Sequence, residues 1–237
     1  MSLSVIIPAK NEEFIIINTL YNLSENLKKS ISENFEIIVI DDFSSDNTFN
    51  LVNNIKNPNI KCISNKLPGV GNAVKCGIEN SSKNYVCIYM ADESDSINDL
   101  VNYYSIIKSE NLDAVFGSRF LKTSKVEDYP FIKLVLNRIF NFIVRLFFYY
   151  GYNDYTNAFK IYKKDVILKL MPLVSEKFNI FLELPLKIIS RKFKFKIIPI
   201  DWKNRKLGVS KFNIKELGSH YIFTFLYCLL EKILLKK

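Results

Sequence analysis

Two stretches decide the fold of this chain: SVIIPAKNE at residues 4–12 and IIVIDDFSSDNT at residues 37–48. Each begins with a short run of aliphatic residues and ends in a polar turn that carries carboxylates. A short run that is apolar on both faces is typical of a strand buried in a parallel sheet. Two such runs separated by an amphipathic stretch predict the beginning of a βαβ unit.

The same alternation continues through the first half of the chain. The expected strands are Leu3–Pro8, Glu36–Ile40, Ile60–Ser64, Tyr85–Met90 and Ala114–Gly117, and the expected helices are Glu12–Leu27, Asp46–Ile55, Gly71–Asn80 and Ile97–Ser109. The pattern predicts a Rossmann-like α/β fold with a mostly parallel central sheet flanked by helices.

The second half is richer in aromatic residues. Phe131–Tyr150 and Leu217–Leu235 are expected to be amphipathic helices with interspersed lysine and arginine, and Phe193–Pro199 alternates as a strand. Apolar faces beside cations suit helices that lie on an anionic membrane surface, and ordinary core helices with solvated lysines are the alternative. We expect one domain over 1–212 and a membrane-associated amphipathic helix over 213–237.

Composition narrows the partners. The chain has 237 residues, 49% of them hydrophobic, and a formal net charge of +9. Such a charge suits phosphate-bearing partners, namely nucleic acid, anionic lipid or sugar nucleotides. Nucleic-acid binding is not expected, because no recognition motif accompanies the charge.

The four cysteines form no CxxC pair, and His220 is the only histidine. A histidine-based zinc site or a Ser-His-Asp triad is therefore not expected, and reduced cysteines indicate a reducing, cytoplasmic compartment. The first residues lack the basic region of a signal peptide, and no run approaches the ~20 apolar residues of a spanning helix.

Polar clusters follow four of the expected strands. They are Ala9–Glu12, Asp41–Asp42, Ala91–Asp95 and Ser118–Arg119. In a parallel sheet the carboxyl ends of the strands share one edge, and ligands bind there. We expect these clusters to form one site.

The motifs in these clusters resemble those of family 2 glycosyltransferases. The matching segments are Pro-x-x-Asn-Glu at Pro8–Glu12, Asp-Asp-x-Ser-x-Asp-x-Thr at Asp41–Thr48, and the glycine segment at Gly69–Ala73. The resemblance implies a GT-A-type fold and inverting transfer from a nucleotide-activated sugar. The donor nucleotide is then expected to contact Pro8, Ala9, Asn11, Glu12, Asp41, Asp42, Gly71, Asn72, Ala91 and Asp92.

The chain departs from the family after the fourth strand. Relatives carry Asp-x-Asp there to hold a divalent cation, whereas this chain has Met90-Ala91-Asp92. A thioether is a poor ligand for Mg²⁺ or Mn²⁺, which prefer oxygen. Either Asp92 holds the cation with help from Glu93 or Asp95, or the cation binds weakly, or basic residues replace it.

Later motifs resemble the subgroup that transfers sugars to polyprenyl phosphates. They are Gly117–Arg119, Asp154–Lys160 and Pro199–Lys211. The resemblance implies phosphate or acceptor contacts by Arg119, Lys133, Asn137, Arg205 and Lys211. Arginine suits phosphate because its guanidinium can donate two parallel hydrogen bonds. A basic loop that contacts only water is the alternative for the last motif.

The expected catalytic residues are Asp92, Arg119 and Glu183. Glu183 would act as general base if the acceptor were a sugar hydroxyl, whereas an ionised lipid phosphate needs no base. Three hypotheses follow: transfer to a polyprenyl phosphate from the inner face of the cytoplasmic membrane, transfer to a surface glycan, or binding without catalysis.

Overall fold

A computed structural model describes residues 2–32, 34–205 and 214–235. The strands are β1 Leu3–Ala9, β2 Phe35–Asp41, β3 Ile60–Ser64, β4 Tyr85–Ile88, β5 Ala114–Ser118, β6 Val126–Glu127, β7 Lys160–Lys163, β8 Phe195–Pro199 and β9 Trp202–Lys203. The helices are α1 Ile16–Ile31, α2 Thr48–Asn53, α3 Val70–Asn80, α4 Ile97–Ser109, α5 Phe131–Phe147, α6 Lys164–Lys169, α7 Ile180–Ser190 and α8 Ile214–Leu234.

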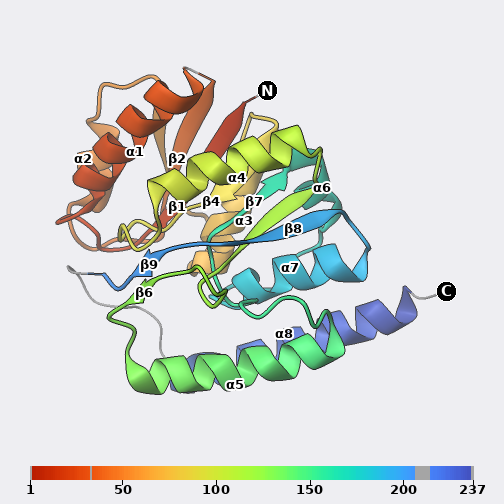
Figure 1. Ribbon diagram of the computed structural model, residues 1–237. Helices are drawn as coiled ribbons and strands as arrows, with labels where there is room; N and C mark the ends of the chain where they lie inside the picture. The colour runs from red at the N-terminus through yellow and green to blue at the C-terminus, as the bar shows by residue number, and fades with distance from the viewer. Residues whose placement is uncertain (1, 33, 206–213, 236–237) are drawn as a thin grey trace.

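The central sheet has the order β3-β2-β1-β4-β7-β5-β8, and β7 alone runs antiparallel to its neighbours. The predicted mostly parallel α/β sheet is confirmed (Figure 1). The chain moves outward from β1 to β3 and then returns to the other side of β1 with β4. The strand order therefore reverses between β1 and β4, which is where ligands bind in such sheets.

Alternate residues of each strand face the two sides of the sheet, and each side has its own core. Ile6 belongs to the core that includes residues of α3, α7 and α8, whereas Val5 and Ile7 belong to the core that includes residues of α1 and α4. All seven residues of β1 are buried, as expected for a strand covered by helices on both faces.

The first predicted helix is wrong at both ends. It was expected over Glu12–Leu27, and α1 runs from Ile16 to Ile31. Residues 12–15 instead form a turn, because the backbone N–H of Glu12 donates to Thr48 and that of Glu13 donates to Asp46. The antiparallel strand β7 and the helices α6 and α7 were not among the predicted elements.

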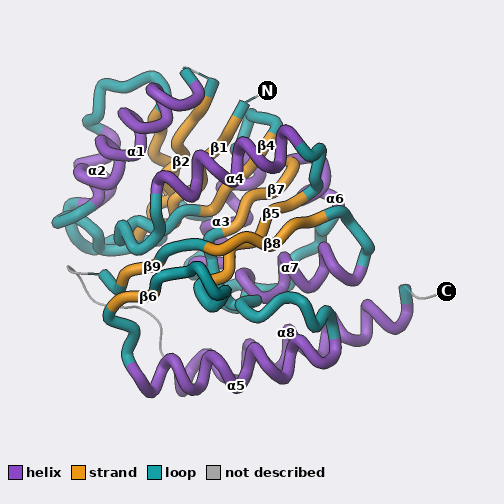
Figure 2. The backbone as a smooth tube through the Cα atoms, in the orientation of Figure 1, coloured by secondary structure: helices purple, strands orange, loops and turns teal. Residues whose placement is uncertain are grey.

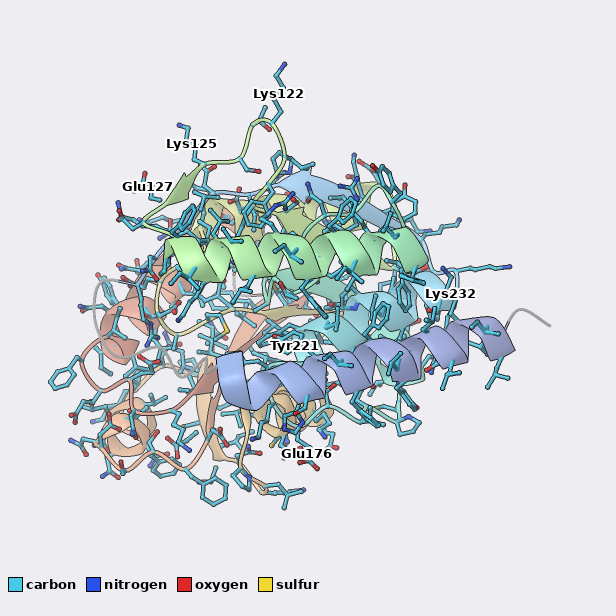
Figure 3. The ribbon with its side chains drawn as sticks, turned by 90° about the horizontal axis from the view of Figure 1, so that it is seen from below. Lys122, Lys125, Glu127, Glu176, Tyr221 and Lys232 are labelled. Carbon is cyan, nitrogen blue, oxygen red and sulfur yellow. The ribbon has the colours of Figure 1, made fainter. Side chains whose placement is uncertain are left out.

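Helices α5 and α8 lie side by side along one edge of the molecule (Figures 1 and 3). Their contact is aromatic: Phe140 packs against Tyr221, and Phe147 and Phe148 pack against Phe225. Helix α8 also buries Tyr221, Thr224 and Cys228, so its inner face belongs to the main core.

The outer faces of both helices are apolar and exposed. Helix α5 and the turn after it expose Phe131, Ile132, Val135, Leu136, Ile139, Phe142, Ile143, Leu146, Phe147, Tyr149 and Tyr150, and α8 and the residue after it expose Ile222, Phe223, Leu226, Leu230, Ile233, Leu234 and Leu235. We call this set the α5–α8 apolar face. Within the described parts of the chain, no helix combines the length and the apolar character needed to cross a membrane.

Candidate active site

The four polar clusters do meet at one edge of the sheet, because β1, β2, β4 and β5 run in the same direction. The turn after β1 is cross-linked to the loop after β2. Asn11, at φ 55°, donates its backbone N–H to Ser44 Oγ at 3.0 Å and accepts from the Ser45 N–H at 2.7 Å. Asp46 accepts from the backbone N–H groups of Glu13 and Thr48, which gives it a structural role.

Asp42 directly follows β2 at this edge of the sheet, and it is only 5% exposed. Its Oδ1 accepts from the Gly69 N–H at 2.8 Å and from Asn65 Nδ2 at 2.9 Å. The described residues donate no hydrogen bond to its other oxygen, Oδ2. The neighbouring Asp41 accepts from the Ser44 N–H through Oδ2, and its buried Oδ1 has no partner in the described parts of the chain. Both aspartates therefore keep an acceptor that a nucleoside N–H or hydroxyl could use.

The two glycines at the start of α3 lie against the backbone of Glu176. Gly69 lies at φ 116°, and a Cβ there would lie 2.4 Å from the Glu176 carbonyl oxygen. At Gly71 a Cβ would lie 2.5 Å from the Glu176 carbonyl carbon, and the Gly71 N–H donates to that carbonyl at 2.8 Å. The glycines thus admit the Glu176 backbone, and the predicted nucleotide contact of Gly71 stays a prediction. Asn72 donates to the Pro68 carbonyl in the same loop at 2.8 Å.

Arg205 joins the two sides of the strand-order reversal. Its guanidinium lies 2.8 Å from Glu12 Oε1, after β1, and 3.1 Å from Asp92 Oδ2, after β4. All three side chains are mostly buried, with exposures of 13%, 8% and 16%. Burial by itself would lower the pKa of Arg205, but the hydrogen bond to Glu12 and the charge of Asp92 raise it, so the guanidinium stays charged.

A divalent cation is implied by the family resemblance, and the side chains around Asp92 do not fit the two-carboxylate site of Asp-x-Asp. Met90 packs against the hydrophobic core, and Glu93 accepts from Asn22 on α1. Asp92 already engages Arg205 through Oδ2 and the Ser94 N–H through Oδ1. In the described parts of the chain no three His, Cys, Asp or Glu side chains cluster to hold a metal.

Asp95 is also poorly suited to hold a cation. Burial and the negative charge of Asp92 raise its pKa to about 8, although Arg119 opposes the shift. A carboxyl group with this pKa is mostly neutral at pH 7, and a neutral carboxyl is a weak metal ligand. Asp95 lines an open hollow of about 250 Å³ together with Lys125 and Trp202.

Arg119 is locked at the end of β5. It forms a two-pronged ion pair with Asp154 at 2.8 and 2.7 Å and is 8% exposed. The rings of Phe120, Tyr129 and Trp202 lie 5.4 to 5.6 Å from its guanidinium carbon. Burial alone would lower the pKa of Arg119, but the Asp154 charge raises it, so this cation is permanent.

The two predicted acceptor residues on α5 are Lys133 and Asn137, and Asn137 contacts Thr156, two residues after the Asp154 that pairs with Arg119. Asn137 donates to Thr156 Oγ1 at 2.8 Å, and Asn141 donates to the same oxygen at 3.1 Å. Lys133 is half-buried one turn earlier. Lys211 lies outside the described residues.

Glu183 is fully buried on α7, away from solvent. Its oxygens lie 2.9 Å from Lys187 Nζ and accept from the N–H groups of Val174 and Ser175 at 3.0 and 2.8 Å. This arrangement orders the loop that carries Glu176. The geometry therefore gives Glu183 a supporting position behind the glycine loop, and its predicted catalytic role stays a prediction.

Sequence reasoning did not assign three features of this site: the Arg205 bridge, the Asp154 partner of Arg119, and the Glu176 carbonyl. Asp154 and Arg205 both stood in motifs whose spacing matched the polyprenyl-phosphate subgroup, so a signal existed for them. The contact of the Glu176 carbonyl left no signal in the sequence, because a contact made by the backbone does not depend on the residue type.

The comparisons with known proteins identify the family of this chain. Residues 4–171 match the family described as Glycosyl transferase family 2. The chain is 32% identical over 184 residues to a dolichyl-phosphate beta-glucosyltransferase of Dictyostelium discoideum, covering 72% of this chain and 56% of that protein. It is 26% identical over 220 residues to a polyprenol monophosphomannose synthase of Mycolicibacterium smegmatis, and this match covers 85% of this chain and 83% of that protein.

Among solved structures, the glucosyl-3-phosphoglycerate synthase of Mycobacterium tuberculosis with Mn²⁺, UDP and phosphoglyceric acid matches with a TM-score of 0.72. The match covers 96% of this chain and 78% of that one at 17% identity, and it supports the GT-A fold. The family match spans well over half of the chain, and the chain belongs to glycosyl transferase family 2.

Proposed function

We propose that this glycosyltransferase moves a sugar from a UDP- or GDP-sugar to a polyprenyl phosphate at a membrane surface. The observation that carries the proposal is the Glu12–Arg205–Asp92 bridge. It places a buried cation at the strand-order reversal, where α/β sheets bind their ligands.

The donor nucleoside would lie on the aspartates after β2. Asp42 Oδ2 and Asp41 Oδ1 keep acceptor capacity, as a base N–H or a ribose hydroxyl requires. Pro8, Ala9, Asn11 and Ala91 stay in the proposed donor site, because they lie at the end of β1 or in the turns that follow β1 and β4, at the same edge of the sheet.

The acceptor proposal draws on the named relatives. A dolichyl-phosphate beta-glucosyltransferase and a polyprenol monophosphomannose synthase are both named for polyprenyl-linked products. Lys133 and Asn137 lie on α5, and Arg119 pairs with Asp154, two residues before the Thr156 that Asn137 contacts. A phosphate held near them would have its lipid tail near the α5–α8 apolar face. That face suits an anionic membrane surface, with Lys133 and Lys232 beside it. We place the protein at the inner face of the cytoplasmic membrane.

The chemistry needs no general base with this acceptor. The bond between the anomeric carbon and the β-phosphate oxygen breaks, and its electron pair stays on the leaving nucleoside diphosphate. An ionised oxygen of the acceptor phosphate forms the new bond to the same carbon, so no proton is transferred. The buried ion pair of Glu183 fits this reaction better than it fits transfer to a sugar hydroxyl.

Transfer of radiolabelled sugar tests the proposal. Polyprenyl phosphate in detergent is incubated with the enzyme and a panel of UDP- and GDP-sugars, in EDTA, Mg²⁺ or Mn²⁺. We expect label in the lipid phase with at least one donor. Nucleotide binding without transfer to lipid in any condition would favour a glycan acceptor or a protein that binds without catalysing.

A further inference from the structure

We infer that Arg205 is the resident cation of the donor site and that nucleotide binding therefore does not require a divalent metal ion. The inference rests on the proposed donor class, a nucleotide-activated sugar. Arg205 would meet the diphosphate oxygens from its place between Glu12 and Asp92. A guanidinium has five N–H donors in a planar fork, so it can serve carboxylate and phosphate oxygens together.

The position of Arg205 is built into the fold. Strand β9 pairs with β6 in a second, two-stranded sheet (Figure 2). The Lys203 N–H donates to the Ser94 carbonyl at 3.1 Å, and the backbones of Asp95 and Trp202 form an isolated antiparallel β-bridge. Arg205 follows two residues after Lys203, so the Asp92–Asp95 loop itself holds the segment that delivers the guanidinium.

Charge explains why Met90 matters. Glu12, Asp92 and Arg205 carry two negative charges and one positive charge, which leaves a net charge of −1 at the bridge. An aspartate at position 90 would make that charge −2 and would repel a diphosphate unless a metal ion entered. The thioether of Met90 packs into the core and adds no charge. This site therefore repels a diphosphate less than a two-carboxylate site without its metal ion would, and it has one built-in cation that can contact the phosphate oxygens.

The role of this cation is to stabilise the charge that develops on the leaving group. When the bond to the anomeric carbon breaks, the nucleoside diphosphate gains one unit of negative charge. A fixed cation beside the diphosphate stabilises that charge without rearrangement of solvent. In metal-dependent enzymes a bound ion does this work.

Calorimetric titration with UDP and GDP tests the inference in EDTA and in Mn²⁺, with Mn²⁺ paramagnetic resonance as a second readout. For the wild type we expect affinities in EDTA and Mn²⁺ that agree within about threefold. In Met90→Asp, the restored carboxylate pair should immobilise Mn²⁺ when nucleotide is present, and Mn²⁺ should raise nucleotide affinity at least about tenfold.

Arg205→Ala separates the resident cation from a merely structural residue. We expect it to lose at least about tenfold in nucleotide affinity in EDTA and to regain part of it in Mn²⁺, because the ion can then lie between Glu12 and Asp92. A collapsed site would not be rescued by metal. Lys196→Ala is the matched control, since it also removes one cation paired with a carboxylate, at Glu110 on the surface.

Two outcomes would overturn the inference, and only the second would also overturn the proposed function. Wild-type binding that is at least about tenfold stronger in Mn²⁺ than in EDTA, with Arg205→Ala unchanged in EDTA, would overturn the inference alone. Absence of UDP and GDP binding in both conditions would overturn the proposed function as well.

Discussion

Glu183 and Lys187 lie one helical turn apart on α7 and form an ion pair of 2.9 Å at exposures of 0% and 1%. Glu183 also accepts the backbone N–H groups of Val174 and Ser175. The next residue, Glu176, offers its carbonyl to Gly71, and the neighbouring Gly69 N–H donates to Asp42. A chain of contacts thus runs from a buried ion pair to the proposed nucleotide site.

Glu183→Gln is expected to lower stability as well as activity. It leaves the buried charge of Lys187 with the more distant Glu231, 3.9 Å away, as its remaining carboxylate partner, which costs up to about 3–5 kcal/mol, or roughly 10 °C in Tm for a chain of this size. Thermal unfolding and sugar transfer are measured together. The double variant Glu183→Gln/Lys187→Met should recover most of both, because it leaves no unpaired charge. If the double variant refolds but stays inactive, Glu183 is a catalytic base after all.

The glycine loop gives a second prediction. Gly69→Ala and Gly71→Ala should each cost about 1–3 kcal/mol and weaken nucleotide binding, because the new Cβ would collide with the Glu176 backbone. Gly218→Ala is the control: a Cβ there meets nothing within 4 Å, and alanine in a helix is better by about 0.5–1 kcal/mol. Chemical denaturation measures the stability, and UDP and GDP titration measures the binding. Equal effects of all three substitutions would contradict the assigned contact.

The central sheet could be predicted from the sequence because its strands are short, apolar on both faces and followed by polar turns. That pattern placed β1 to β5 and the edge where Glu12, Asp42 and Asp92 meet. It did not find β7, since Lys160–Lys163 is short and carries a lysine at each end. Lys160 is nevertheless buried, because its Nζ donates to backbone carbonyls that only the folded chain brings together.

The site was predictable as a set of residues and not as a set of contacts. Motif spacing indicated Asp92 and Arg205 separately, although the two residues are 113 positions apart in the sequence. Their ion pair depends on the anchoring of β9 to the Ser94 loop, which is a tertiary event. The same holds for Glu183: an acidic residue in the expected place suggested a base, and its contacts with Lys187, Val174 and Ser175 could not be read from the sequence.

Membrane binding gives a third prediction. The double variant Ile139→Asp/Phe142→Asp changes two exposed residues of α5, at 54% and 52% exposure, so folding should be unaffected. Each removes an apolar contact worth about 1.5–3 kcal/mol in the lipid interface, so flotation with anionic vesicles should fall at least tenfold. Tyr21→Ser, on α1, removes an exposed ring (67%) outside the α5–α8 apolar face and should float like the wild type. Unchanged flotation of the double variant would contradict the docking face.

The last prediction concerns the pH dependence of stability at Asp95. Burial and the charge of Asp92 raise its pKa from 3.8 to about 8, so the folded state binds a proton that the unfolded state releases above pH 3.8. Stability is then lost as pH rises between these two values. Asp95→Asn cannot ionise, so its Tm advantage over the wild type should grow from pH 5 to pH 8 in scanning calorimetry.

Glu36→Gln is the control with the opposite sign. Burial opposes the ionisation of Glu36, but hydrogen bonds from Ser4, Ser82 and Lys61 prevail and lower its pKa to about 2. Its contribution is present above its ordinary pKa of 4.5 and is lost only as pH falls toward 2. Glu36→Gln should therefore lower Tm by a similar amount at pH 5 and pH 8. A Tm difference for Asp95→Asn that is also constant over this range would show that Asp95 is ionised in the folded protein, held in that state by the charge of Arg119.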